Sequence, residues 1–215
     1  MKDYAAARRL MVQRQLVARG IKDQRVLAAM EEVPRHRFVD EALQDEAYDD
    51  GPLPIGGGQT ISQPYMVAVM TELLRLYEDC LVLEVGTGSG YQAAVLTRLC
   101  KWVYTVERID SLAERAKSAI EKCGYTNISF LVGDGTQGWP DHAPYHGIVV
   151  TAGAPKIPET LVDQLVEGGG LVIPVGDRFS QILKLVTRTR EGTLVESHTG
   201  CRFVDLVGKF GWSRN

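Results

Sequence analysis

Residues 84–91 read EVGTGSGY, and this stretch decides how the rest of the chain is interpreted. It follows an apolar run at residues 80–83 and precedes a helix-like segment at residues 92–100. A buried strand, a glycine turn and a helix N-terminus together form a nucleotide-binding edge in open α/β sheets. Glycines in the turn allow the backbone to bend sharply and to approach a ligand without an intervening Cβ.

The spacing of the glycines separates two cofactor classes. Dinucleotide sites prefer G-x-G-x-x-G, whereas here Gly86, Gly88 and Gly90 follow Glu84 in the pattern E-x-G-x-G-x-G. That pattern resembles the first motif of S-adenosylmethionine-dependent methyltransferases. The alternative is a strand-to-helix turn that binds no cofactor, because glycine motifs give false positives. An NAD-dependent oxidoreductase is disfavoured by the glycine spacing and by the lack of a recognisable hydride-transfer site.

Length and composition favour one α/β domain with additions over residues 1–215. The formal net charge is -3 and the isoelectric point is about 5.8, so no bulk attraction to nucleic acid or to an anionic membrane is implied. No apolar run approaches the ~20 residues of a membrane span. We therefore predict a protein that binds neither nucleic acid nor membrane. We also expect it to be a cytoplasmic monomer, although net charge and hydropathy do not determine the oligomeric state.

The cysteines and histidines indicate no metal centre. The four cysteines lack C-x-x-C spacing and lie in mainly apolar contexts, which is typical of reduced core residues in a cytoplasmic protein. His142 and His146 have the spacing of ligands on a helix, but Pro140 and Pro144 disfavour a helix there.

Three regions follow from the order of the signals. Residues 1–48 form a helical lead-in, with one helix ending at Gly20 and a second, capped by Asp23, running to about residue 32. The first helix has an apolar face of Ala6, Leu10 and Val17. Residues 49–64 form a Gly- and Pro-rich loop whose apolar anchors favour order, and loops of this length are often functional. A helix is expected from Pro64 to about residue 76.

Residues 65–215 contain the sheet core. Strands are expected at residues 81–85, 102–106, 128–132, 147–150 and 171–174, and helices at residues 92–100, 111–123 and 158–166. A capping box of Ser111 and Glu114 would begin the second of these helices. This alternation predicts a doubly wound, mostly parallel sheet with helices on both faces. Residues 182–187 and 202–207 would add an antiparallel pair at one edge.

Two acids follow neighbouring strands. Glu107 ends the second strand of the core, where a carboxylate can accept hydrogen bonds from both ribose hydroxyls; an NAD site would ask for the same acid, and a solvated charge is the alternative. Asp134, in a Gly-Asp-Gly turn after the third strand, can accept from an adenine amino group or can simply form a turn. Together with the glycine turn, the acids occur in the order that a nucleoside site requires.

Longer segments resemble the protein-L-isoaspartate (D-aspartate) O-methyltransferase family across nearly the whole chain. The matching segments are LPIG at 53–56, QTISQPYM at 59–66, LEVGTGSGYQAA at 83–94, GDGTQGW at 133–139 and GGGLVIPVG at 168–176. The Thr-Ile-Ser-x-Pro element is the family-specific part. The resemblance implies a class I methyltransferase that transfers a methyl group from S-adenosyl-L-methionine to the free α-carboxylate of isoaspartyl residues in damaged proteins and peptides. Repair would then proceed through a succinimide.

The resemblance also assigns residues. Ser62 is implied to be the active-site serine, and its position at a helix start suits a carboxylate ligand, although it could merely cap the helix. The implied cofactor contacts are Ile61, Ser62, Gln63, Pro64, Glu84, Gly86, Gly88, Gly90, Glu107, Arg108, Asp134 and Gly135. The implied substrate contacts are Gly58, Gln59, Thr60, Arg202 and Val204; for Arg202 a solvent-exposed strand residue is an equal alternative.

An α-carboxyl has a reference pKa of about 3.3–3.7 and is ionised at neutral pH. We therefore expect no strong general base, and we assign Ser62 to orienting the carboxylate.

The loop at residues 56–63 is a candidate lid, and residues 202–207 could pair with a peptide backbone. Two positions depart from the family pattern. Gly57 stands where the family often has a larger residue, and Asp205 stands where it usually has a proline. The remaining alternatives are a methyltransferase for RNA or a small molecule, and a non-catalytic binding protein.

Overall fold

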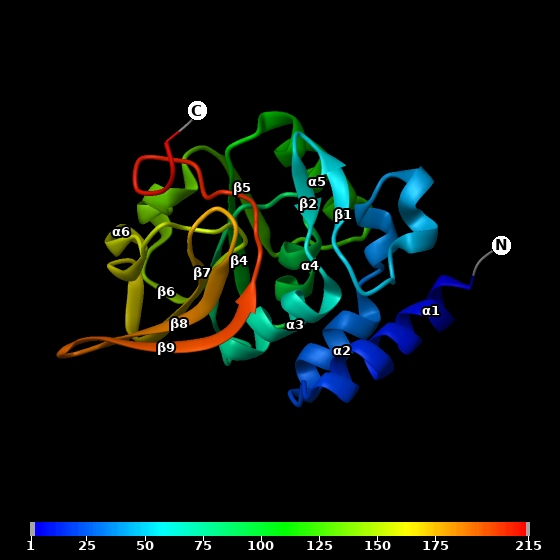
Figure 1. Ribbon diagram of the computed structural model, residues 1–215, viewed down its shortest axis with the longest axis horizontal. Coiled ribbons are helices and arrows are strands. Elements are labelled where there is room, and N and C mark those ends of the chain that lie inside the picture. The colour runs from blue at the N-terminus through cyan, green and yellow to red at the C-terminus, as the bar shows by residue number, and fades with distance from the viewer. Residues whose placement is uncertain (1–2, 214–215) are drawn as a thin grey trace.

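The computed structural model describes residues 3–213 and contains a seven-stranded central sheet (Figure 1). The strand order is β5-β4-β3-β6-β7-β8-β9. The strands are β3 (Leu81–Val85), β4 (Trp102–Glu107), β5 (Ile128–Val132), β6 (Tyr145–Val150), β7 (Leu165–Gly176), β8 (Gln181–Thr189) and β9 (Gly192–Cys201). β5, β4, β3, β6 and β7 run parallel, whereas β8 and β9 are antiparallel additions. The predicted fold class is confirmed.

Helices cover the two faces of the sheet unequally. The α-helices are α1 (Tyr4–Met11), α2 (Gln24–Glu32), α3 (Pro64–Leu73), α4 (Tyr91–Thr97), α5 (Asp110–Lys122) and α6 (Glu159–Val162), and 3-10 turns lie at Arg35–Phe38, Glu41–Glu46, Gly135–Gln137 and Pro140–His142. Apolar side chains of α2 to α5 pack on one face, and α6 lies on the other. No helix within residues 3–213 has the length and apolar character needed to cross a membrane.

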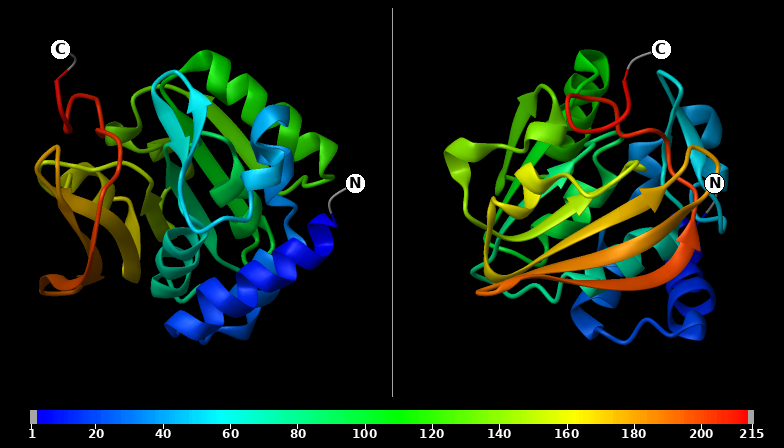
Figure 2. Two further views of the ribbon diagram at one scale, coloured as in Figure 1. Left: turned by 45° about the vertical axis from the view of Figure 1, so that its right-hand side comes forward. Right: turned by 60° about the vertical axis from the view of Figure 1, so that its left-hand side comes forward.

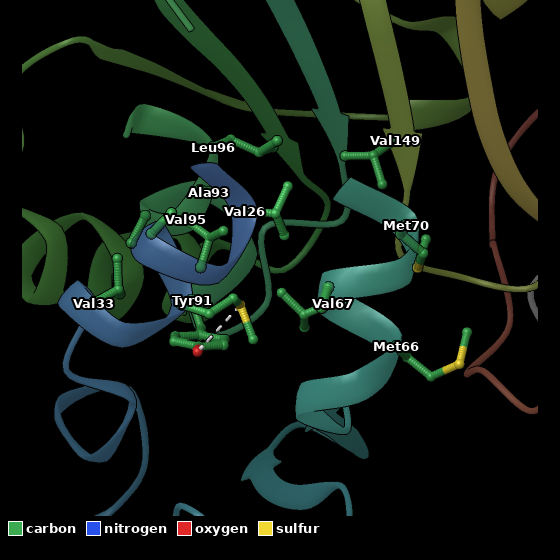
Figure 3. Close-up of a cluster of buried hydrophobic side chains, with 14 of the residues drawn as sticks. Val26, Val33, Met66, Val67, Met70, Tyr91, Ala93, Val95, Leu96 and Val149 are labelled. Carbon is green, nitrogen blue, oxygen red and sulfur yellow. Dashed lines mark hydrogen bonds between the residues drawn. The ribbon is translucent and has the colours of Figure 1, made fainter. Parts of the chain in front are cut away.

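The larger part of the core lies between the sheet and helices α2, α3 and α4. Val26, Val67 and Tyr91 converge there, one from each helix (Figure 3). Successive side chains of a strand point to opposite faces, so in β3 Val82 joins this cluster while Leu83 joins the cluster on the other face. The glycine turn after β3 is therefore anchored on a strand that is buried from both sides.

The sheet order reverses at β3, because the chain continues to β4 on one side and returns to β6 on the other. In open α/β sheets the crevice for ligands opens at such a reversal, outside the carboxyl ends of the strands. The β1–β2 hairpin and the C-terminal segment both lie at this end of the molecule (Figure 2). Topology thus brings three distant parts of the chain to one edge.

The predicted loop at residues 49–64 is ordered, as expected, and contains a small antiparallel hairpin. Its strands are β1 (Leu53–Gly56) and β2 (Gln59–Ile61). Gly57 and Gly58 connect them with φ of 59° and 70°. A two-residue hairpin turn with positive φ at both positions favours glycine, which explains the glycine run.

The first helix of the lead-in differs from the prediction in which face it buries. Leu10 and Val17 are 48% and 42% exposed, whereas Met11, Val12 and Leu16 are buried. In α1 itself the buried side is formed by Met11 with Tyr4 and Ala7, and not by Ala6 and Leu10. After α1 the hydrogen bonds widen to a π-helical turn at Val12–Leu16, which shifts only the later side chains, such as Val17, relative to a regular 3.6-residue period. The helix end at Gly20, with φ of 94°, and the cap of α2 by Asp23 are both confirmed.

Two predicted helix boundaries were wrong. Ser111 lies inside α5, which begins at Asp110 without a side-chain cap. The helix expected at residues 158–166 is only α6, because β7 already begins at Leu165.

The last strand is β9, and residues 202–207 do not form a strand of the sheet. β9 is exposed on nearly all its residues, so its sequence lacks the apolar alternation of a half-buried strand. Residues 202–207 instead meet Gly153 in an isolated bridge, in which Gly153 N–H donates to Val204 O at 2.7 Å and Leu206 N–H donates to Gly153 O at 2.9 Å.

Candidate active site

A cavity opens at the carboxyl ends of β3, β4 and β6. The glycine loop after β3 forms its floor, and residues 106–108 and 151–152 continue that floor on either side. Residues 59–62 of the hairpin and residues 204–207 of the C-terminal segment form the remaining walls. The cavity therefore combines the predicted cofactor motif with the predicted substrate loop.

The glycine loop approaches the end of β6 so closely that side chains do not fit. Gly86 has φ of 96°, and a Cβ there would collide with Thr151 Oγ1. The Thr151 hydroxyl donates to Gly86 O at 2.6 Å, which fixes the loop on the neighbouring strand. Gly90 serves a different purpose: it begins α4 with φ of 87°, and a Cβ there would press on Ile120 and Ala116 of α5. Gly86 and Gly88 thus shape the cavity, and Gly90 allows helix packing.

Glu107 is held rigidly at the end of β4. Its carboxylate accepts hydrogen bonds from Gly88 N–H and Ile109 N–H, both at 2.9 Å, and the residue is only 6% exposed. Each carboxylate oxygen has a second acceptor direction, and Glu107 lines the cavity. The arrangement can accept hydrogen bonds from two neighbouring hydroxyl groups of a ligand.

Glu84 lies beneath the cavity and does not line it. It is fully buried, one oxygen accepts from the Thr105 hydroxyl at 2.5 Å, and the other oxygen has no protein partner. Burial raises the pKa of the Glu84 carboxyl to about 8, opposed by the Thr105 hydrogen bond and assisted by the nearby charge of Glu107. The hydroxyls of Thr105 and Thr87 lie 2.6 Å apart, so Glu84 supports the glycine loop from below through a chain of hydroxyl groups.

Asp134 is turned toward the C-terminal segment. Its carboxylate accepts hydrogen bonds from the N–H and hydroxyl of Thr136 and from Lys209 N–H at 2.8 Å. Burial alone would raise the pKa of the Asp134 carboxyl, but these hydrogen bonds lower it below its usual value. Gly135 lines the cavity, where a Cβ would lie 2.6 Å from Val85 Cγ1. Asp134 therefore ties the C-terminal wall to the sheet, next to the glycine that borders the cavity.

Ser62 faces the cavity from the hairpin side. α3 begins at Pro64 with Gln63 as its N-cap residue and without a side-chain cap hydrogen bond, so the prediction that Ser62 could merely cap this helix is wrong. Within residues 3–213 the Ser62 hydroxyl makes no hydrogen bond. A half-buried hydroxyl on the cavity wall without a protein partner is available to a ligand.

The structure brings most of the predicted site residues together. Those that line the cavity are Gln59, Thr60, Ile61, Ser62, Gly86, Gly88, Glu107, Arg108, Gly135 and Val204. Those outside its lining are Gly58, Gln63, Pro64, Glu84, Gly90, Asp134 and Arg202.

Sequence reasoning missed Thr87, Ser89 and Thr151 in the lining. Thr151 directly follows β6, at the same edge of the sheet as Glu107. Its position just after a predicted strand could have indicated that it lines the site, because ligands bind outside the carboxyl ends of the strands.

A glycine loop that closely approaches the neighbouring strand at Gly86, followed by a fixed acid at the end of the next strand, is typical of a nucleoside-binding site on this fold. Comparison with known proteins agrees. The model of the protein-L-isoaspartate (D-aspartate) O-methyltransferase family matches residues 7–211, and the chain belongs to this family. It is an enzyme whose methyl donor is S-adenosyl-L-methionine.

Relatives in sequence and in structure extend over nearly the whole chain. The chain is 58% identical to protein-L-isoaspartate O-methyltransferase 1 of Syntrophobacter fumaroxidans over 212 residues, which cover 99% of both chains. It is 55% identical to the protein-L-isoaspartate O-methyltransferase of Geobacter metallireducens over 98% of both chains. A solved protein-L-isoaspartate O-methyltransferase superposes with a TM-score of 0.86 at 31% identity, covering 95% of this chain and 67% of that one.

A structure from Plasmodium falciparum, assigned to the same activity and solved with S-adenosyl-L-homocysteine, superposes with a TM-score of 0.81. It is 26% identical and covers 96% of this chain and 99% of that chain.

Proposed function

We propose that this enzyme methylates the free α-carboxylate of L-isoaspartyl residues in damaged proteins and peptides, and so begins their repair through a succinimide. The observation that carries the proposal is the unpartnered Ser62 hydroxyl, which faces the glycine loop and Glu107 across one cavity. A site that only bound a nucleoside would need the loop and the acid but not a free hydroxyl opposite them.

The cavity residues fit the methyl donor. S-adenosyl-L-methionine supplies an activated methyl group on a sulfonium. Glu107 would accept from the ribose hydroxyls, and Gly86 and Gly88 would admit the donor close to their backbone because a Cβ is lacking. Gly135 would leave room for the adenine ring, with Asp134 beside it as an acceptor for the amino group.

The acceptor side needs orientation rather than proton removal. An α-carboxylate with a reference pKa of about 3.3–3.7 is already ionised at neutral pH. Ser62 would donate a hydrogen bond to one of its oxygens, and the N–H groups at the start of α3 would favour the negative charge. Fixing the reacting groups in this way can contribute roughly 7–11 kcal/mol to catalysis at best.

The peptide around the isoaspartyl residue would lie along the hairpin and the C-terminal segment. Gln59, Thr60 and Val204 line this part of the cavity. Gly58 lies at the exposed hairpin tip and Arg202 at the exposed start of the C-terminal segment, so both would contact only parts of a substrate that extend beyond the cavity. We further propose a monomer that acts in the cytoplasm, in keeping with its four free cysteines.

The direct test is transfer of a tritiated methyl group from S-adenosyl-L-methionine to an isoaspartyl peptide and to its normal aspartyl twin. We expect base-labile label on the isoaspartyl peptide alone. Equal labelling of both peptides would contradict the proposed substrate, and label on RNA instead would replace it with a different methyl acceptor.

A further inference from the structure

The end of the first helical stretch of the N-terminal lead-in, at Arg19, reaches the active-site hairpin. The Arg19 guanidinium lies 3.5 Å from the ring centroid of Tyr65, which stands in the first turn of α3, directly after Ser62, Gln63 and Pro64. The same guanidinium forms an ion pair with Asp50, with 3.2 Å between Nη1 and Oδ2. One cation therefore contacts a residue before the hairpin and a residue after it.

Asp50 links Arg19 to the residue that follows Ser62. Its other oxygen accepts a hydrogen bond from Gln63 Nε2 at 2.8 Å. Gln63 is the N-cap residue of α3 and the neighbour of Ser62. Arg19, Asp50, Gln63 and Tyr65 thus connect the lead-in with both ends of the segment that carries Ser62, and we name this group of four residues the Arg19 clamp.

The lead-in is also attached to the other end of α3. Glu72 Oε1 accepts from Lys22 N–H and Asp23 N–H, both at 2.7 Å. Arg25 Nη1 donates to Leu76 O, also at 2.7 Å. The lead-in therefore runs along α3 and is fastened near its first and its last turn, so that the start of α3 cannot shift independently.

The segment before Ser62 has little rigidity of its own. Gly56, Gly57 and Gly58 have φ of 85°, 59° and 70°, and all three are exposed. Glycines lose the most conformational freedom on folding, and an isolated hairpin of two strands is only marginally stable. Buried Ile55 and Ile61 hold the two strands, but the glycine tip is exposed, so contacts from outside the hairpin are needed to hold the backbone at Ser62 in one position.

We propose that Arg19 is a positioning residue for methyl transfer, which holds Ser62 in its productive orientation through the Arg19 clamp; this rests on the proposed role of Ser62. Arg19 does not line the cavity, so it would act through its neighbours and not on the reacting groups. The side chains of Arg19 and Asp50 are 40% and 46% exposed, so their ion pair contributes little to stability. Misplacement of a reacting group costs rate even where stability hardly changes.

The test compares Arg19→Gln with Arg14→Gln and Arg19→Lys. Arg14 is exposed in the same lead-in and makes no hydrogen bond or ion pair within residues 3–213, so Arg14→Gln removes the same charge without touching the clamp. We expect Arg19→Gln to lower kcat for an isoaspartyl peptide about tenfold, with affinity for S-adenosyl-L-homocysteine and melting temperature close to those of Arg14→Gln. Arg19→Lys should recover most of the rate, because it keeps the cation beside Tyr65 and Asp50.

Hydrogen exchange supplies a readout that does not depend on turnover. Amides of residues 56–63 should exchange faster in Arg19→Gln than in Arg14→Gln. If Arg19→Gln does not fold, Asp50→Asn tests the same clamp and should give the same fall in kcat.

Turnover of Arg19→Gln within twofold of Arg14→Gln would overturn the proposal, as would equal slowing by Gln and Lys or unchanged exchange of the hairpin. An inactive wild-type enzyme would instead refute the proposed function.

Discussion

The two walls of the cavity are built in different ways. The donor wall consists of the glycine loop at residues 86–90, Glu107 and Thr151, and its polar groups are fixed by main-chain hydrogen bonds at the ends of parallel strands. The acceptor wall consists of the hairpin with Ser62 and the C-terminal residues 204–207. It is glycine-rich, partly exposed, and held by side chains from distant parts of the chain.

This difference implies a division of labour. We expect the donor wall to set affinity for the nucleoside, because its shape follows from strand topology. We expect the acceptor wall to set turnover, because its orientation depends on contacts between residues far apart in the sequence. Substitutions in the donor wall should therefore change cofactor binding first, and substitutions in the acceptor wall should change kcat first.

The largest expected effect is that of Gly86→Ala on cofactor binding. Both Gly86 and Gly124 have positive φ, but only at Gly86 would a Cβ meet another group, Thr151 Oγ1. A non-glycine residue at such φ costs about 1–3 kcal/mol at either site. We expect Gly86→Ala to weaken S-adenosyl-L-homocysteine binding at least ~100-fold, equivalent to about 2.7 kcal/mol, in calorimetric titrations.

Gly124→Ala is the matched control, since Gly124 follows α5 and has open space around it. It should lose some stability but keep its affinity for the nucleoside. Similar affinity losses in both variants would show that the donor wall is not shaped by close approach.

Ser62→Ala should act on turnover. Loss of a hydrogen bond to a charged group costs roughly 1.5–3 kcal/mol, so we expect kcat for an isoaspartyl peptide to fall about 10- to 100-fold. Affinity for S-adenosyl-L-homocysteine should change less than about threefold, since Glu107 and the glycine loop are intact. A variant with near-normal kcat, or with equal losses of cofactor affinity and kcat, would break the comparison between the walls.

Glu84 predicts how stability depends on pH. Burial raises the pKa of Glu84 from 4.5 to about 8, so the folded state keeps a proton that the unfolded state loses, and the free energy of unfolding falls as pH rises between these values. Burial lowers the pKa of His36 below 6.5, which gives the opposite slope up to pH 6.5. From pH 6.5 to 8 we therefore expect a loss of about 1.4 kcal/mol per pH unit at most.

Glu84→Gln should flatten this loss in urea unfolding curves between pH 6.5 and 8, because the amide does not titrate. The variant should be more stable than the wild type at pH 8. If the free energy of unfolding changed with pH in the same way in both proteins, Glu84 would not hold the extra proton in the folded state.

The smallest expected effect concerns Asp205 on the acceptor wall. Its carboxylate lies 3.3 Å from Arg178 Nε and lines the cavity, so a negative charge stands near the expected peptide. We expect Asp205→Asn to lower KM about two- to fivefold for an isoaspartyl peptide with an acidic neighbour, and less for a neutral one, since partly exposed charges contribute about 0.2–1 kcal/mol. A change in cofactor affinity without a change in KM would contradict the assignment of Asp205 to the acceptor wall.

Most of the donor wall, apart from Thr87, Ser89 and Thr151, was predictable from sequence because its determinants are local. The motif from Glu84 to Gly90, the acid at the end of β4 and the alternation of strands and helices each have a signature within a few residues. The sequence did not indicate the protein contacts of two of these acids. Glu84 is buried and accepts a hydrogen bond from Thr105, and Asp134 accepts hydrogen bonds from Lys209 and Thr136.

The acceptor wall was less predictable because long-range contacts shape it. Residues 202–207 were expected to form a strand of the sheet, but the backbone of residues 204 and 206 hydrogen-bonds to Gly153 instead. The attachment of Arg19 to Tyr65 spans 46 positions, and no local pattern of charge or hydropathy indicates such a partner.

The most direct test of the two-wall account is a crystal structure with S-adenosyl-L-homocysteine and an isoaspartyl peptide bound together. We predict both ribose hydroxyls within about 2.6–3.2 Å of the Glu107 carboxylate, and the Ser62 hydroxyl on the free carboxylate of the peptide. Adenosine bound away from Gly88 and Glu107, or a peptide carboxylate that Ser62 does not touch, would contradict it.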